Sequence, residues 1–169
     1  MSALSRRHML KGSAAGLVWP QMAAAATPRV LGWEDLIPPG VPYAQIIGEG
    51  FIDARRDIWL PEFDENATKL NADLVDAYIK LPGFMLPLEL AAEGITSFIM
   101  VPYAGACIHV PPPPANQLVF VETAVPWPTQ SYWDPVWVTG IISHQFQSTT
   151  LADIGYAMSA ERIEAYEWD

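Results

Sequence analysis

Cys107 and His109 stand two positions apart, directly before the four prolines Pro111–Pro114. In an extended backbone, side chains two residues apart point to the same face, so this thiolate and this imidazole can reach one metal ion. Thiolate sulfur and imidazole nitrogen are ligands that suit Zn(II) and copper. The spacing therefore predicts part of a metal site, with zinc as the first candidate.

Two ligands do not hold an ion tightly, so other parts of the fold must supply further ligands. His144 is the first choice, because it is the only other histidine once the N-terminal segment that contains His8 is removed. Acidic candidates near the ends of expected strands are Glu89, Glu122 and Asp134. We therefore predict a site with Cys107, His109 and His144 as its metal ligands.

The Cys-x-His pair also allows interpretations without a metal. Cysteine is among the most buried residue types, and a histidine beside prolines can simply hydrogen-bond a loop carbonyl. A thiol enzyme would use the pair as nucleophile and base, but the sequence shows no orienting acid and no oxyanion-forming turn. It also lacks a glycine-rich phosphate loop, a dinucleotide fingerprint and a zinc-protease helix, which argues against nucleotide and nicotinamide cofactors. These patterns favour a binding protein over an enzyme.

The prolines at 111–114 predict a left-handed polyproline segment with polar ends at Asn116 and Gln117. Such a rod can dock into an aromatic groove on a partner, or it can be a stiff connection between strands. A second proline-rich stretch, at 126–128, is surrounded by aromatic residues: Trp127, Tyr132, Trp133 and Trp137. Because cationic neighbours are missing, these aromatics indicate core cover or a protein-binding surface rather than base stacking.

The elements that would position these residues are mostly strands. Residues 27–72 predict an extended N-terminal arm, with a helical turn or two between Pro61 and Leu70. From residue 75, apolar and polar side chains alternate with the two-residue period of a half-buried strand. The expected strands are 75–81, 84–90, 95–103, 117–123, 136–142 and about 162–166, with a break at Pro82-Gly83 and a short helix from Thr149 or Thr150 to about Ala157.

This pattern predicts an all-β domain with minor helix at residues 73–169, arranged as a small antiparallel barrel. Residues 1–26 predict a twin-arginine export signal. Arg6 and Arg7 are followed by an uncharged stretch from Gly12, which ends in Ala24-Ala25-Ala26 and suits cleavage near Ala26. The segment is too short for a permanent span, and no later apolar run is long enough, so we expect a periplasmic protein without a stable membrane anchor.

Removing residues 1–26 takes away three of the nine basic residues and no acid. Six basic residues then face 19 acidic residues, which gives a formal charge of −13. That charge repels phosphate backbones and anionic lipids, so nucleic acid is an unsuitable partner. About 143 residues remain, the size of one domain. The single cysteine leaves no partner for an internal disulfide.

The run GACIHVPPPPANQ at 105–117 carries a family resemblance, together with LPGFMLPLEL at 81–90, FIMVPY at 98–103 and DPVWVTG at 134–140. Over roughly residues 70–166 the chain resembles the DUF3299 family of exported bacterial proteins. This resemblance implies an OB-like β-barrel and a role as an accessory of ABC-type envelope transport, sometimes under zinc-responsive control. It implies no reaction. A metal-free structural interaction module therefore stays open as the alternative.

Overall fold

The computed structural model describes residues 26–54, 58–88, 92–106, 112–129, 131–149 and 151–167. Its strands are β1 (Arg29–Val30), β2 (Phe51–Asp53), β3 (Ile58–Leu60), β4 (Ala77–Pro87), β5 (Ile95–Val101), β6 (Val119–Trp127), β7 (Asp134–Ser148) and β8 (Asp153–Ala165). Its helical elements are short 3₁₀ turns: η1 (Trp33–Leu36), η2 (Glu65–Thr68), η3 (Ala72–Leu74) and η4 (Ala115–Gln117). The expected all-β class with minor helix is confirmed.

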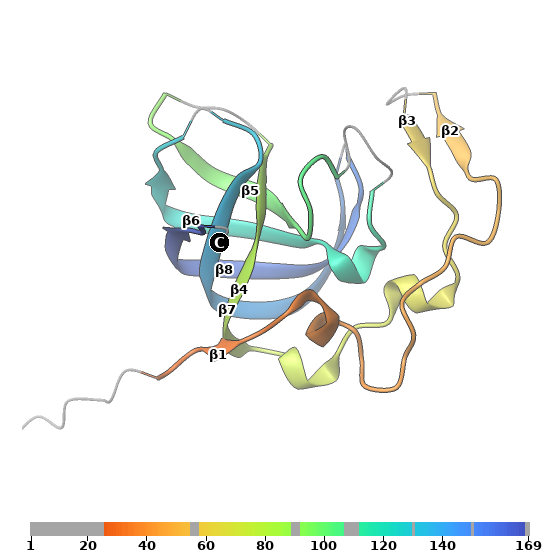
Figure 1. Ribbon diagram of the computed structural model, residues 1–169, viewed down its shortest axis with the longest axis horizontal. Coiled ribbons are helices and arrows are strands. Elements are labelled where there is room, and N and C mark those ends of the chain that lie inside the picture. The colour runs from red at the N-terminus through yellow and green to blue at the C-terminus, as the bar shows by residue number, and fades with distance from the viewer. Residues whose placement is uncertain are drawn as a thin grey trace, which may run out of the picture.

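Five strands make up the main sheet, with the two-residue β1 added in parallel to β4. The chain of pairings is β4–β5–β6–β8–β7, and β7 pairs again with β4. All of these pairs are antiparallel except β6 with β8, which run parallel. Figure 1 shows the strands curving around a common interior, with the hairpin of β2 and β3 standing apart from them. Among the described residues, none of the helices has the length and apolar character needed to cross a membrane.

Alternate residues of the long strands fill the interior. On β4 the inward side chains are Ile79, Leu81 and Met85, all fully buried, and Tyr156 and Met158 of β8 follow the same two-residue period. A second buried cluster lies toward the end where β7 turns into β8, and it consists of Leu86, Ile99, Val101, Ala106, Leu118, Ala152 and Ile154. The alternation from Ala77 to Leu81 therefore reflects a packed core, but the predicted strand at 75–81 begins two residues too early, because Val75 is the C-cap of η3 and is exposed.

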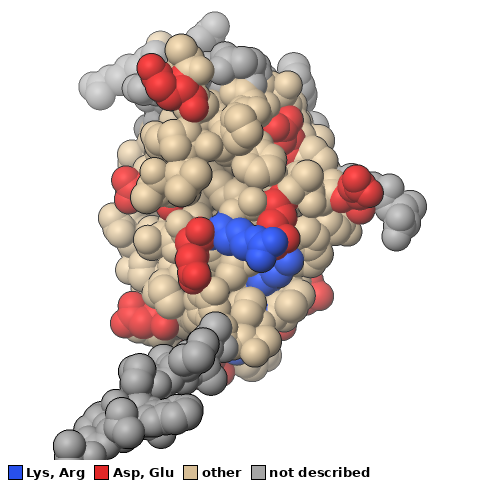
Figure 2. Space-filling view, turned by 90° about the vertical axis from the view of Figure 1, so that its left-hand side faces the viewer, with Lys and Arg blue, Asp and Glu red and all other residues tan. Residues whose placement is uncertain are grey.

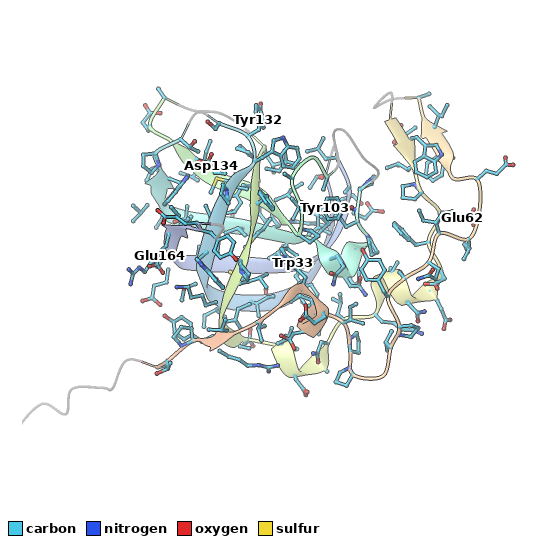
Figure 3. The ribbon with its side chains drawn as sticks, in the orientation of Figure 1. Trp33, Glu62, Tyr103, Tyr132, Asp134 and Glu164 are labelled. Atoms are coloured by element: carbon cyan, nitrogen blue, oxygen red, sulfur yellow. The ribbon has the colours of Figure 1, made fainter. Side chains whose placement is uncertain are left out.

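The predicted break at Pro82-Gly83 is wrong, because β4 continues through both residues and pairs with β7 there. Trp33 explains how the strand tolerates them. Its indole Nε1 donates to the Pro82 carbonyl at 2.8 Å, and a Cβ on Gly83 would lie 2.8 Å from its ring. The missing side chain thus makes room for the tryptophan on the strand (Figure 3).

The predicted helix from Thr149 or Thr150 to Ala157 is also wrong, since this stretch turns and enters β8. The Thr149 hydroxyl does act as a cap, but of a tight turn: it accepts from the backbone of Leu151 at 3.2 Å and of Ala152 at 3.1 Å. Gly155 then passes so close to η4 that a Cβ would lie 2.9 Å from the Ala115 carbonyl oxygen. Packing between distant segments fixes the strand here.

The N-terminal residues are tied to the sheet by a buried tyrosine. The Tyr156 hydroxyl donates to the Leu36 carbonyl at 2.6 Å and accepts from the Asn71 amide at 2.7 Å. Asn71 in turn donates its Nδ2 to the Asp35 carbonyl at 2.8 Å. One side chain of β8 therefore joins η1 and the start of η3 across more than 80 residues of chain.

Tyr156→Phe should lower the free energy of unfolding by about 2–4 kcal/mol, because the Leu36 carbonyl and the Asn71 amide both lose their buried partner. Burial raises the pKa of the Tyr156 hydroxyl from 10.0 to about 12. The stability contributed by the protonated hydroxyl is thus complete below pH 10 and lost as the pH rises toward 12. Urea unfolding at pH 7 and across that alkaline range measures both effects.

Tyr132→Phe is the matched control, because Tyr132 is half exposed and should change stability by less than about 0.5 kcal/mol. The Tyr156→Phe variant should also lose part of the alkaline decline that the unmodified chain shows. Equal stabilities for the two variants would contradict the role assigned to the Tyr156 hydroxyl.

Candidate functional site

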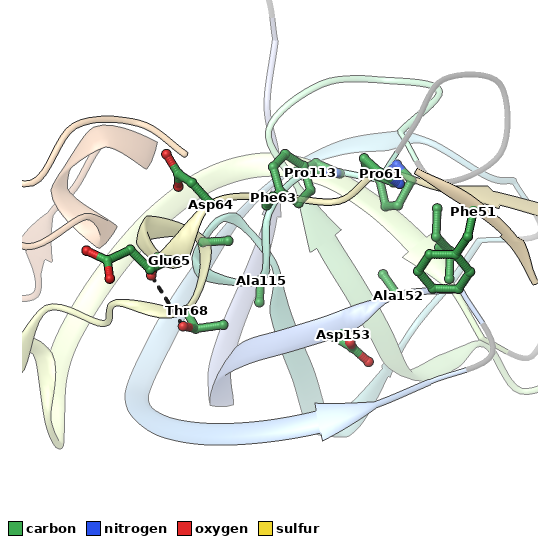
Figure 4. A pocket seen from close by; sticks show the side chains of 13 residues that line it. Phe51, Pro61, Phe63, Asp64, Glu65, Thr68, Pro113, Ala115, Ala152 and Asp153 are labelled. Carbon is green, nitrogen blue, oxygen red and sulfur yellow. Dashed lines mark hydrogen bonds between the residues drawn. The ribbon is translucent and has the colours of Figure 1, made fainter. Parts of the chain in front are cut away.

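A groove separates the arm from the end of the sheet where β7 turns into β8. Its central hollow has a volume of about 410 Å³ and is shown in Figure 4. The arm contributes Phe51, Leu60, Pro61 and Phe63, the η2 region contributes Asp64, Glu65, Ala67 and Thr68, and the opposite wall consists of Pro112, Pro113, Ala115, Ala152 and Asp153. Apolar side chains thus face each other across the hollow, with carboxylates at its rim.

Two further hollows adjoin the central one through different lining residues. One, of about 510 Å³, shares Phe63, Pro112 and Pro113 with it and adds Tyr43 and Tyr103. The other, of about 250 Å³, shares Thr68, Ala115 and Asp153 with it and adds Phe146, Gln147 and Ser148. We call the three hollows together the arm groove. Each outer hollow is thus adjacent to the central one.

The proline segment forms one wall of the arm groove, held by the polar residues that follow it. Asn116 Nδ2 donates to the carbonyls of Asn66 at 2.8 Å and Lys69 at 3.1 Å, and Gln117 Nε2 donates to the Trp33 carbonyl at 3.0 Å. Residues 112–114 are themselves buried. These contacts favour the stiff connection between strands over a rod that inserts into a partner.

The opposite wall belongs to the hairpin of β2 and β3, in which Phe51 pairs with Leu60. A two-stranded sheet is marginally stable in water on its own, and this one is strongly apolar: Phe51 is 58% exposed and Ile52 is 71% exposed. Ile46 and Ile47, just before the hairpin, are also exposed. Singly exposed apolar residues are ordinary, but a run of them beside a groove indicates a contact surface.

The charged residues that line the arm groove, among those the structure describes, are all acidic. Asp64, Glu65 and Asp153 line it, and no lysine or arginine is among its described lining residues. Asp64 caps η2 by accepting from the Asn66 amide at 2.9 Å, and Asp153 accepts from the Ser148 hydroxyl at 2.6 Å. These bonds hold both carboxylates in place.

Two basic side chains pair with an acid outside the groove lining, whereas Lys69 pairs with Glu65, which lines the groove. Lys80 and Arg162 both approach Glu164 at 2.9 Å, and Lys69 approaches Glu65 at 2.8 Å. Figure 3 places Glu164 on the side away from the arm, and Figure 2, which views that side, shows basic and acidic groups next to each other.

Two polar atoms near the arm groove are buried without a partner among the described residues. They are the Asn116 Oδ1 and the Gln147 Nε2, and Gln147 lines the smallest hollow. At the other end, burial and the neighbouring Tyr103 raise the pKa of the Tyr43 hydroxyl. Tyr43 therefore stays protonated near neutral pH and can donate a hydrogen bond into the groove.

The predicted metal ligands are only partly within the described chain. Cys107 and His109 lie outside the described residues, as do Glu89 and the export segment at 1–25, while Ala106 and Pro112 on either side of the pair are buried. His144 is on β7, where its Nε2 lies 2.9 Å from the Asn71 carbonyl oxygen. A carbonyl only accepts, so Nε2 donates there and Nδ1 is the nitrogen left for a metal.

The acidic candidates do not gather around His144. Glu122 is exposed on β6, and Asp134 at the start of β7 accepts from the Trp127 indole at 3.2 Å. Among the described residues, no group of three or more His, Cys, Asp and Glu side chains is arranged to hold a metal ion. Sequence patterns did not predict the arm groove, although the large apolar residues of the arm could have indicated it.

A family model and one solved structure give the same family. The family model DUF3299, described as a protein of unknown function, matches residues 33–165. A crystal structure of a DUF3299 family protein from Pseudomonas aeruginosa PAO1 is similar at 35% identity with a TM-score of 0.68, covering 85% of this chain and 99% of that chain. A putative aspartyl-tRNA synthetase from Leishmania major Friedlin shows 13% identity and a TM-score of 0.41, over 90% of this chain and 23% of that one. No curated protein matches.

Proposed function

The chain belongs to the DUF3299 family, and we propose that it is an exported accessory protein of the bacterial envelope that binds a polypeptide partner in the arm groove. The observation that carries this proposal is the groove itself, with an apolar hairpin on one side and a buried proline wall on the other. Grooves of this composition suit non-covalent recognition. The resemblance described above makes a component of an ABC-type transport system the proposed partner.

We further propose that the main sheet is an OB-like barrel. Three features support this: five strands, a chain of pairings that returns from β7 to β4, and the parallel pair of β6 and β8. The parallel pair requires the chain to cross over between β6 and β8, as a Greek-key path does. The groove lies beside the β7–β8 turn, a region where OB barrels commonly bind their ligands.

Zinc binding is the second part of the proposal. It rests on the same-face spacing of Cys107 and His109, and on the free Nδ1 of His144 as a third donor. A metal-free interaction module is the alternative, because the arm groove needs no metal to present its apolar walls. Zinc titration separates these two possibilities.

Site-specific crosslinking in the native bacterium tests the partner. A photo-reactive amino acid replaces Thr68, which lines two of the three hollows, and separately Val125, which is 73% exposed and lines none of them. We expect a crosslinked product from the Thr68 position alone, and mass spectrometry should identify an envelope transport component in it. No product, or equal products from both positions, would contradict the proposed function.

A further inference from the structure

The arm groove suits an extended polypeptide chain as its ligand. The central hollow shares Phe63, Pro112 and Pro113 with one neighbouring hollow, and Thr68, Ala115 and Asp153 with the other. A compact ligand would occupy one hollow and leave the others empty. An extended segment advances about 3.3 Å per residue and can place successive side chains in all three.

The two halves of the groove differ in their lining and therefore suit different side chains of a partner. At one end Tyr43, Phe63 and Tyr103 stand beside Pro112–Pro114, the aromatic and proline surface that recognises apolar or proline residues of an extended chain. In the centre and at the other end, Asp64 and Asp153 supply negative charge, Glu65 pairs with Lys69, and the described lining residues include no lysine or arginine. The Asp64 and Asp153 carboxylates would attract a cationic group on the partner.

We propose that the occupant of the arm groove is an extended partner segment that carries basic side chains next to apolar or proline residues. This inference rests on the proposed function and names the chemistry of the partner. Charge complementarity carries it: the lining is acidic, and the chain after residue 26 has a formal charge of −13. The same excess charge opposes a second copy of this chain as the occupant.

Fluorescence anisotropy with synthetic peptides tests the inference on the protein isolated from its host. Three labelled peptides of about 12 residues, about 40 Å when extended, share their proline and aromatic positions. Their remaining positions are arginine in the first, serine in the second and glutamate in the third. The arginine peptide should bind about tenfold or more tighter than the serine peptide, with affinity falling as salt is added, and the glutamate peptide should bind weakest.

Paired variants locate the binding. Thr68→Trp fills the centre of the groove and should abolish binding of the arginine peptide, whereas Val125→Trp should leave it unchanged. Asp153→Asn should weaken it about threefold, against no change for Glu122→Gln, an exposed acid outside the groove. Thermal melting checks that each variant is folded.

Equal affinities for the arginine and serine peptides would overturn the inference, as would a Thr68→Trp variant that is folded and still binds. Either result can coexist with a groove-specific crosslink in the bacterium, which would sustain the proposed function with a different partner chemistry. Conversely, missing crosslinks count against the proposed function and leave a measured preference for basic peptides intact.

Discussion

Replacing both Arg6 and Arg7 with lysine should leave the precursor in the cytoplasm, uncleaved. The change keeps two positive charges and removes only the planar guanidinium groups, so it separates twin-arginine recognition from a general need for charge. The segment that follows, from Gly12 to Ala26, is uncharged and ends in three alanines. Fractionation of the bacterium, followed by immunoblotting for precursor and processed forms, measures the result.

Arg29→Lys is the control for this export experiment, because Arg29 lies beyond the expected cleavage point and pairs through β1 with Ile79 of β4. It changes the same chemical group and should leave export unaffected. Processed protein in the periplasm of the double lysine variant would show that the segment does not use the twin-arginine route.

Local patterns predicted the strands well wherever burial alternates along the chain. The alternation around Ile79 and Leu81 and the β-branched residues near Val119 and Val138 are all in strands. The predicted strand at 136–142 was too short, because β7 continues to Ser148 through residues with no clear period. The pairing of β7 with β8, joined by the Thr149 turn, holds that exposed extension.

Predictions from local patterns were wrong where residues distant in the sequence determine the local structure. Gly83 would end a strand in isolation, but here Trp33, 50 positions earlier, packs against it. Thr149 is a good helix cap by sequence, yet the parallel pairing of β6 with β8 draws the following residues into the sheet. Tertiary contacts override local propensity in both cases.

The candidate site depends even more on contacts between residues that are distant in the sequence. The proline run and its polar ends could be recognised from the sequence, but not that Asn116 reaches the Asn66 carbonyl and Gln117 the Trp33 carbonyl. These bonds join segments roughly 50 and 84 positions apart and create the groove between them. No periodicity in one segment encodes such an encounter.

Cys107→Ser and His109→Ala should each weaken zinc binding by a large factor. We expect the loss to exceed the roughly 10- to 100-fold that is usual when a residue that hydrogen-bonds to a metal ligand is changed. Both side chains bind a metal only when deprotonated, so affinity should also fall as the pH is lowered. Zinc at about 100 times its dissociation constant should stabilise the native protein by about 2.7 kcal/mol and raise its melting temperature. Calorimetric titration of untagged, chelator-treated protein with Zn(II) and Cu(I) measures the affinities.

His144→Ala tests the third ligand within the same series. If Nδ1 of His144 binds the ion, its loss should weaken zinc binding, while Glu122→Gln should have no effect, since Glu122 is exposed on β6. His144→Ala also removes the bond to the Asn71 carbonyl, so its melting temperature without zinc must be compared as well. A Cys107→Ser, His109→Ala double variant that binds zinc as the unmodified chain does would assign the Cys-x-His segment a structural role and leave the metal-free interaction module in its place.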